Sequence, residues 1–166
     1  MGIDDLNIEM VKEKYSQLKM TKDKNSYIFS GEFILNHCFK DVRMTGKFEL
    51  EIGVPEESPL APPKVKELSH YIDRNYPHIY QDGQFCLASD LELKIFLSQN
   101  ADICSFIDQY IIPYLYTYRF YEEYGVYPYG ERSHGIIGDL EYLKDLFRVD
   151  DWRQVFNIIL FVVQSP

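Results

Sequence analysis

The sequence is poor in cysteine, and its few cysteines are widely spaced. Only Cys38, Cys86 and Cys104 occur in 166 residues, and none of them forms a Cys-x-x-Cys pair. An odd number of cysteines without paired spacing makes neither a disulfide framework nor a recognisable zinc site, and it is typical of a reducing compartment. We therefore predict free thiols, no metal and a cytoplasmic location.

Long apolar runs are lacking as well. The last one, residues 155–163, contains Asn157 and is too short to span a bilayer. The first residues show no basic leader followed by an apolar stretch, so no secretory signal is seen. These absences predict a soluble protein without a membrane partner.

Positive charge is the third deficit, because 17 Lys and Arg residues stand against 26 Asp and Glu residues and give a net charge of -9. Such a charge repels a phosphate backbone and argues against a nucleic-acid partner. Aromatic residues, in contrast, are abundant at 16%, chiefly as 14 Tyr and 11 Phe. Tyrosines in this number suit the edge of a core or an interface. The length suits one domain over residues 1–166.

Hydrophobic spacing predicts a helix and then strands in the first half of the chain. Residues 3–20 carry apolar side chains at near-helical intervals. Residues 27–39 have strand-like apolar and aromatic content, and residues 47–54 alternate between apolar and polar side chains. Alternation is typical of a half-buried strand in an antiparallel meander, with residues 40–43 as the connecting turn.

Prolines and helical spacing dominate the second half. A short strand is predicted over residues 64–68, after a run of prolines that interrupts regular structure. Helices are predicted from Asp102 to about Arg119, over 139–147 and over 152–163, with 124–135 irregular between them. Pro113 should kink the first of these helices or end its first part. The fold class is α+β: a small antiparallel sheet with helices against one side and at its ends.

The most informative segment is 75–87, which is rich in turn formers and places Cys86 shortly after an Asp-Gly pair. A cysteine on an irregular loop can meet a large partner, and a thiolate is both a good nucleophile and a good leaving group. No Lys or Arg flanks Cys86 to activate it strongly. Cys38, in its strand, and Cys104, in its helix, are expected to be small buried hydrophobes.

This segment resembles the active-site loop of ubiquitin-conjugating enzymes, which reads His-Pro-Asn-Ile, a short variable stretch, Gly, two residues and then Cys-Leu. Upstream, the strand that ends near Ile52, the proline after it and a Pro-Pro-x-Val run also resemble the family, and the likeness covers about Ser26 to Leu115. The matching loop positions are Tyr76-Pro77-His78-Ile79, Gly83 and Cys86-Leu87.

Residues 125–135 are more similar to the bacterial branch of that family, whose members are found beside cyclic-oligonucleotide synthases in antiphage defence (CBASS) and in bacterial ubiquitin-like operons. The resemblance implies that Cys86 carries the C-terminus of a synthase or a ubiquitin-like protein as a thioester and passes it to a target. It implies no cofactor, and it leaves open the modifier, the acceptor and the need for an activating enzyme.

Two positions depart from the family pattern. Tyr76 replaces the family His, and His78 replaces the Asn that is credited with stabilising the oxyanion. An imidazole at position 78 could donate the same hydrogen bond. Equally, His78 could be a loop histidine bonded to a backbone carbonyl. Tyr76, Pro77, Asp82 and Gly83 are interpreted as residues that position the loop.

His134 is a candidate second element, an acid or base near the thiol, within a segment that also reads as a capped turn through Ser133 and Asp139. Two other functions stay open. One is a non-catalytic binding module of the same fold that scaffolds or regulates a cyclic-oligonucleotide synthase. The other is a cysteine hydrolase that uses a Cys86–His134 couple.

Overall fold

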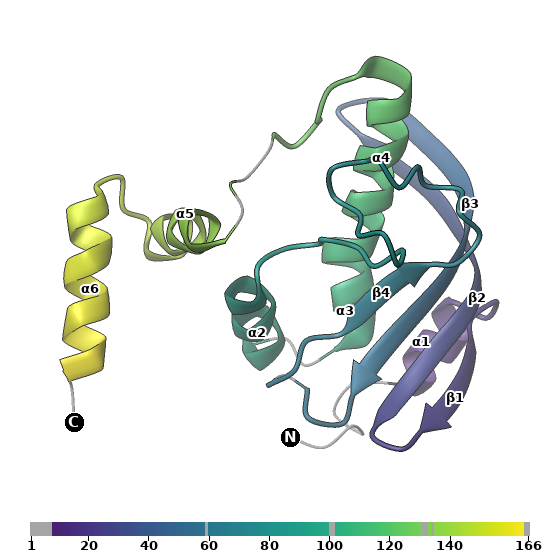
Figure 1. The fold of residues 1–166 in the computed structure, drawn as a ribbon, viewed down its shortest axis with the longest axis horizontal. Helices are drawn as coiled ribbons and strands as arrows, with labels where there is room; N and C mark the ends of the chain where they lie inside the picture. The colour runs from purple at the N-terminus through teal and green to yellow at the C-terminus, as the bar shows by residue number, and fades with distance from the viewer. Residues whose placement is uncertain (1–7, 59, 100–101, 131–132, 134, 165–166) are drawn as a thin grey trace. The chain divides into compact units, whose positions relative to one another are not determined.

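The computed structural model describes residues 8–58, 60–99, 102–130, 133 and 135–164 (Figure 1). The chain divides into two compact units, Met1–Tyr129 and Gly130–Pro166, which are described separately. The first unit holds a four-stranded sheet and most of the helices, and the second holds a helix pair. The α+β class is therefore confirmed, while one domain over residues 1–166 stays a prediction.

The sheet is an antiparallel meander in the order β1-β2-β3-β4, formed by Lys19–Asp23, Ser26–Phe39, Val42–Pro55 and Lys64–Glu67. Strands β2 and β3 pair along their whole length, from Ser26↔Pro55 to Phe39↔Val42. Lys40 and Asp41 join them with positive φ angles of 47° and 64°, the backbone that a two-residue hairpin turn requires. The predicted connection at 40–43 is thus confirmed and is tighter than expected.

Alternation decides which face of the sheet is buried. In β3 the side chains of every second residue from Phe48 to Val54 are buried, and those between them are more exposed. Helix α4 packs against β2 and β3, and α1 (Ile8–Lys14) packs against α3 (Ile103–Phe106). The core of the first unit therefore lies between the sheet and these helices (Figure 1).

Pro113 shapes the longest helical segment without ending it. Helix α3 continues through a π-helical turn, Ile107–Ile111, into α4, Ile112–Tyr124. The Ile112 N–H donates to the Ile107 carbonyl five residues back, directly before the proline. A π-turn at this point accommodates a ring that would otherwise meet a carbonyl of the preceding turn. The helix ends at Gly125, whose φ is 69°, rather than near Arg119.

Two further predicted boundaries are wrong, and one helix was not predicted. The N-terminal helix ends at Lys14, and part of the predicted range 3–20 is β1, an edge strand whose residues are almost all exposed and show no alternation. Strand β3 begins at Val42, five residues before the predicted 47–54. Helix α2, Asp90–Gln99, was not predicted, although its buried Leu93, Phe96 and Leu97 follow helical spacing. Strand β4 lies where the sequence placed it.

The second unit consists of α5 (Ile136–Phe147) and α6 (Trp152–Gln164), close to the predicted 139–147 and 152–163. Arg148 ends α5 with a φ of 55°, and the Asp151 carboxylate accepts from the Arg153 N–H at the start of α6. None of the helices in the described part of the chain combines the length and the apolar character needed to cross a membrane.

Candidate functional site

Cys86 lies at the end of a tight hairpin that pairs with the outer edge of β4. Ile79 pairs with Phe85, and the Tyr80 N–H donates to the Gln84 carbonyl at 2.8 Å. On the side of β4, the Phe85 N–H donates to the Val65 carbonyl at 2.8 Å. The loop that sequence analysis read as irregular therefore has its backbone fixed by the sheet.

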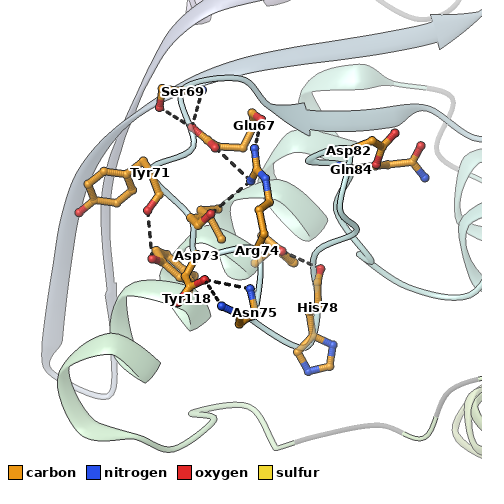
Figure 2. Close-up of polar contacts among 12 residues, drawn as sticks. Glu67, Ser69, Tyr71, Asp73, Arg74, Asn75, His78, Asp82, Gln84 and Tyr118 are labelled. Carbon is orange, nitrogen blue, oxygen red and sulfur yellow. Dashed lines mark hydrogen bonds and ion pairs between the residues drawn. The ribbon is translucent and has the colours of Figure 1, made fainter.

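A buried ion pair lies beneath this hairpin (Figure 2). The Glu67 side chain is fully buried, and the Arg74 Nη1 lies 3.2 Å from its Oε2. Arg74 Nη2 also donates to the Glu67 carbonyl at 2.9 Å, and the Ser69 N–H donates to Oε1 at 2.9 Å. The carboxylate thus has the partners that a buried charge requires.

Gly83 is the point where the hairpin touches this ion pair. Its carbonyl accepts from the Glu67 N–H at 3.0 Å, and its φ is 84°. A Cβ at this position would lie 2.6 Å from the Glu67 carbonyl oxygen and 2.9 Å from Arg74 Nη2. Glycine is therefore required both for the backbone conformation and for the close approach. The predicted role of Gly83 in positioning the loop would depend on these two requirements.

The Cys86 thiol is half-buried and borders a cavity of about 320 Å³. The walls come from the proline-rich crossing before β4, the Cys86 hairpin and the start of α2, which Ser89 caps by accepting from the Glu92 N–H. Tyr80 lines the same cavity as Cys86, and the pKa of its phenol is raised first by a side-chain hydrogen bond to Cys86.

His78 is held by its backbone and by aromatic neighbours. Its carbonyl accepts from the Cys86 N–H at 2.9 Å and from the Tyr114 hydroxyl at 2.7 Å. Its ring lies edge-on to the rings of Tyr76 and Tyr127, with centroids 5.6 Å and 5.4 Å away. Figure 2 shows this ring directed away from the buried ion pair. The structure thus joins His78 to Cys86 through the main chain.

Tyr76, Pro77 and Asp82 are the other residues that were predicted to position the loop. Tyr76 is buried and contacts a cluster of tyrosine rings, while Pro77 is exposed in the turn before His78. The Asp82 carboxylate lies 2.9 Å from Lys66 Nζ and accepts from the Gln84 N–H at 3.1 Å. The bond to Lys66 is the main reason why the pKa of Asp82 is lowered. Asp82 therefore ties the tip of the hairpin to β4.

The remaining candidates give mixed results. His134 lies outside the described residues. Ser133 donates from its N–H and its hydroxyl to the Glu141 carboxylate, at 3.0 Å and 2.9 Å, but the N-cap of α5 is Gly135 and has no side-chain cap. Cys104 is buried, as predicted, and burial raises its pKa. Cys38 was predicted to be buried and is exposed, because the alternation of β2 turns Leu35 inward and position 38 outward.

Glu67, Arg74, Tyr80 and Tyr114 were not predicted from the sequence as residues of the site. The single signal for Glu67 is its phase, because it follows the buried Val65 at the strand period of two. Among the residues that the structure describes, no group of three or more His, Cys, Asp or Glu side chains is arranged to hold a metal ion.

No protein-family model matches this chain, and no curated protein matches it either. The family likeness therefore consists of the loop and proline motifs in the sequence. What the site can do has to be argued from its geometry.

Proposed function

We propose that this chain is a thioester-forming conjugating enzyme of the ubiquitin-conjugating type, with Cys86 as the carrier. The observation that carries the proposal is the placement of the thiol: a half-buried cysteine at the end of a fixed hairpin, on the border of a cavity. A carrier thiol needs this combination, because an incoming chain has to reach the sulfur while the loop keeps its place.

The proposed chemistry is two acyl transfers without a change in oxidation state. The Cys86 thiolate attacks the carbonyl carbon of a thioester borne by another protein. A carbon–sulfur bond forms to Cys86 as the donor's bond breaks, and the donor leaves as a thiol with the proton that Cys86 released. A target amine then attacks the same carbon, the bond to Cys86 breaks, and the sulfur regains a proton from the amine.

The proposed partners follow from the likeness to the bacterial branch. The transferred group is the C-terminus of a cyclic-oligonucleotide synthase or of a ubiquitin-like protein, and the process is antiphage defence. The net charge of -9 accords with a protein partner and disfavours a nucleic acid. Neither transfer requires a metal or a cofactor.

His78 is proposed as the donor to the oxyanion that forms during these transfers, in place of the family Asn. The shared main-chain bond, from the Cys86 N–H to the His78 carbonyl, supports the proposal by fixing the two residues next to each other. The aromatic contacts of the ring to Tyr76 and Tyr127 limit its motion.

The test uses tagged chain expressed with its native operon and recovered under non-reducing conditions. We expect a covalent conjugate that reductant cleaves, that Cys86→Ala abolishes and that Cys86→Ser converts into a hydroxylamine-labile ester. Cys38→Ala is the matched control, because Cys38 is an exposed thiol far from the hairpin in the sequence, and it should conjugate as the wild type does. A conjugate that persists in Cys86→Ala refutes the proposal.

The second candidate is a non-catalytic binding module that scaffolds the synthase. The observation that favours it is the His78 ring, which packs between two tyrosines where the family has an Asn. For such a module, pull-down of the synthase and protection against phage both survive Cys86→Ala. For the carrier, protection is lost in this variant while the fold, measured by thermal unfolding, is kept.

A further inference from the structure

Tyr80 is the tyrosine that lines the cavity together with Cys86. Tyr80 and Cys86 both line the cavity of about 320 Å³, and a hydrogen bond between their side chains is the first cause of the raised pKa of Tyr80. A role in core packing does not fit Tyr80, because this residue is 54% exposed. An exposed tyrosine that shares a cavity with a thiol calls for a different explanation.

The hairpin fixes this arrangement through the main chain. The Tyr80 N–H donates to the Gln84 carbonyl at 2.8 Å, and the Tyr80 carbonyl accepts from the Gly83 N–H at 2.9 Å. The next pair, Ile79 and Phe85, is bridged, and both of its side chains are buried. Side chains alternate across such a pairing, so Tyr80 and Cys86 stand on the face opposite to the buried pair.

The hydroxyl is equipped to act as a donor. The hydrogen bond to Cys86, followed by the charge of the thiolate, raises the pKa of Tyr80 above its ordinary value of 10.0. The phenol therefore stays protonated at neutral pH, and its O–H can point at a negatively charged sulfur. Asp82 and Lys66, the charged pair at the hairpin tip, are bound to each other at 2.9 Å.

We infer that Tyr80 is a catalytic residue: its O–H donates a hydrogen bond to the Cys86 sulfur whenever that sulfur carries negative charge. This occurs as the thiolate attacks the incoming carbonyl and again as it leaves when the target amine has added. No bond to Tyr80 forms or breaks, and no proton is transferred from it. The catalytic statement rests on the proposed carrier function, whereas stabilisation of the thiolate does not.

The first experiment therefore measures the thiolate itself. Tyr80→Phe and wild type are treated with iodoacetamide at neutral pH, and the alkylation of each cysteine is followed by peptide mass analysis. A hydrogen bond to a charged group is worth about tenfold in an equilibrium. Loss of the donor should lower the fraction of Cys86 present as thiolate, while the thiolate that remains becomes a better nucleophile. The second effect offsets part of the first, so alkylation of Cys86 should slow by about threefold. Cys38 serves as the internal reference, since its rate should not change.

Tyr124→Phe is the matched control variant. Tyr124 is 50% exposed, and its raised pKa is caused first by a hydrogen bond to Glu123, with no contribution from a thiol. It should leave the alkylation of Cys86 unchanged. Thermal unfolding should show that both phenylalanine variants are as stable as the wild type. If Cys86 of Tyr80→Phe reacts as fast as wild-type Cys86, the inference is overturned.

The second experiment separates this inference from the proposed function. A short peptide thiobenzyl ester with a Gly-Gly end is offered to each variant, and the mass of the acyl adduct on Cys86 is followed before and after addition of free lysine. We expect Tyr80→Phe to load and discharge about threefold more slowly than the wild type, for the same reason as in the alkylation. An adduct that forms equally in Cys86→Ala contradicts the carrier function. Equal rates for Tyr80→Phe and wild type, with Cys86 required, contradict only the role of Tyr80.

Discussion

The buried Glu67–Arg74 pair offers the sharpest test of how the site is supported. Glu67→Gln keeps the length of the side chain and removes its charge. The Glu67 side chain has no exposed surface, and that of Arg74 is 15% exposed, so water does not replace what the substitution removes. The amide can still accept the Ser69 N–H bond at one oxygen. Its nitrogen would then face Arg74 Nη1, and two donors would meet.

The magnitude follows from these contacts. A hydrogen bond to a charged group contributes about 1.5–3 kcal/mol, and an unpaired buried cation adds a further penalty, so breaking such a pair costs about 3–5 kcal/mol. Arg74 keeps its bonds to the Glu67 and Ile72 carbonyls, which offset part of this penalty. We expect the free energy of unfolding to fall by about 3 kcal/mol in Glu67→Gln.

Urea titration followed by circular dichroism measures the loss, provided that the slope of the transition is the same in both proteins. The matched control is Glu32→Gln, because the pair of Glu32 with Lys47 at 3.3 Å is largely exposed and should contribute less than about 1 kcal/mol. The double variant Glu67→Gln/Arg74→Met should lose less than the sum of the single variants, because it leaves no cation without a partner. A loss below about 1 kcal/mol in Glu67→Gln, with additive single variants, would refute the reasoning.

Two further predictions concern the hairpin and the tyrosines. Gly83→Ala should lose about 2–4 kcal/mol of unfolding free energy in the same titration, because residue 83 has a φ of 84° and the new Cβ would lie 2.6 Å from the Glu67 carbonyl oxygen. The control is Gly125→Ala, which has a φ of 69° and open space around it and should lose about 1 kcal/mol. Burial raises the pKa of both Tyr114 and Tyr118 above 10.0 in the folded state, so their contribution to stability is complete below pH 10 and is lost as the pH rises beyond it. Thermal unfolding from pH 8 to 11 should show this loss, and Tyr114→Phe should reduce it; an unchanged profile in that variant would contradict the assignment to Tyr114.

The sequence predicted the class of the fold because its longest elements carry strong periodic signals. The alternation in β3 and the helical spacing over α3 and the π-turn reflect burial of one face, which the sequence records directly. In α6, in contrast, only Val155 is buried. The edge strand β1 leaves no such record, since it is held by pairing with β2 and buries almost nothing. The π-turn before Pro113 is likewise invisible, because a proline in helical spacing is compatible with a kink, an end or an inserted residue.

The residues of the site also differ in whether the local sequence is enough to predict them. The turn at Asp82-Gly83 could be predicted because glycine at a positive φ is a local requirement. The pairing of Glu67 with Arg74 could not, because charged residues in a short strand are normally exposed and only the tertiary structure supplies the burial. The contact between the Tyr80 hydroxyl and the Cys86 thiol depends on the hairpin register, which follows from pairing with β4 and not from spacing in the sequence.

The supports of the hairpin also show why Cys86→Ala separates chemistry from structure. The hairpin is held by Val65 and Glu67 of β4 and by the Tyr114 hydroxyl, and each of these contacts engages main-chain atoms of the loop. Removal of the sulfur leaves all of them in place, so the loop should keep its shape. A loss of conjugation in Cys86→Ala, with unfolding unchanged, would then report the missing thiol alone. An equal loss in Gly83→Ala would report the position of the hairpin, because that variant keeps the sulfur and disturbs what holds it.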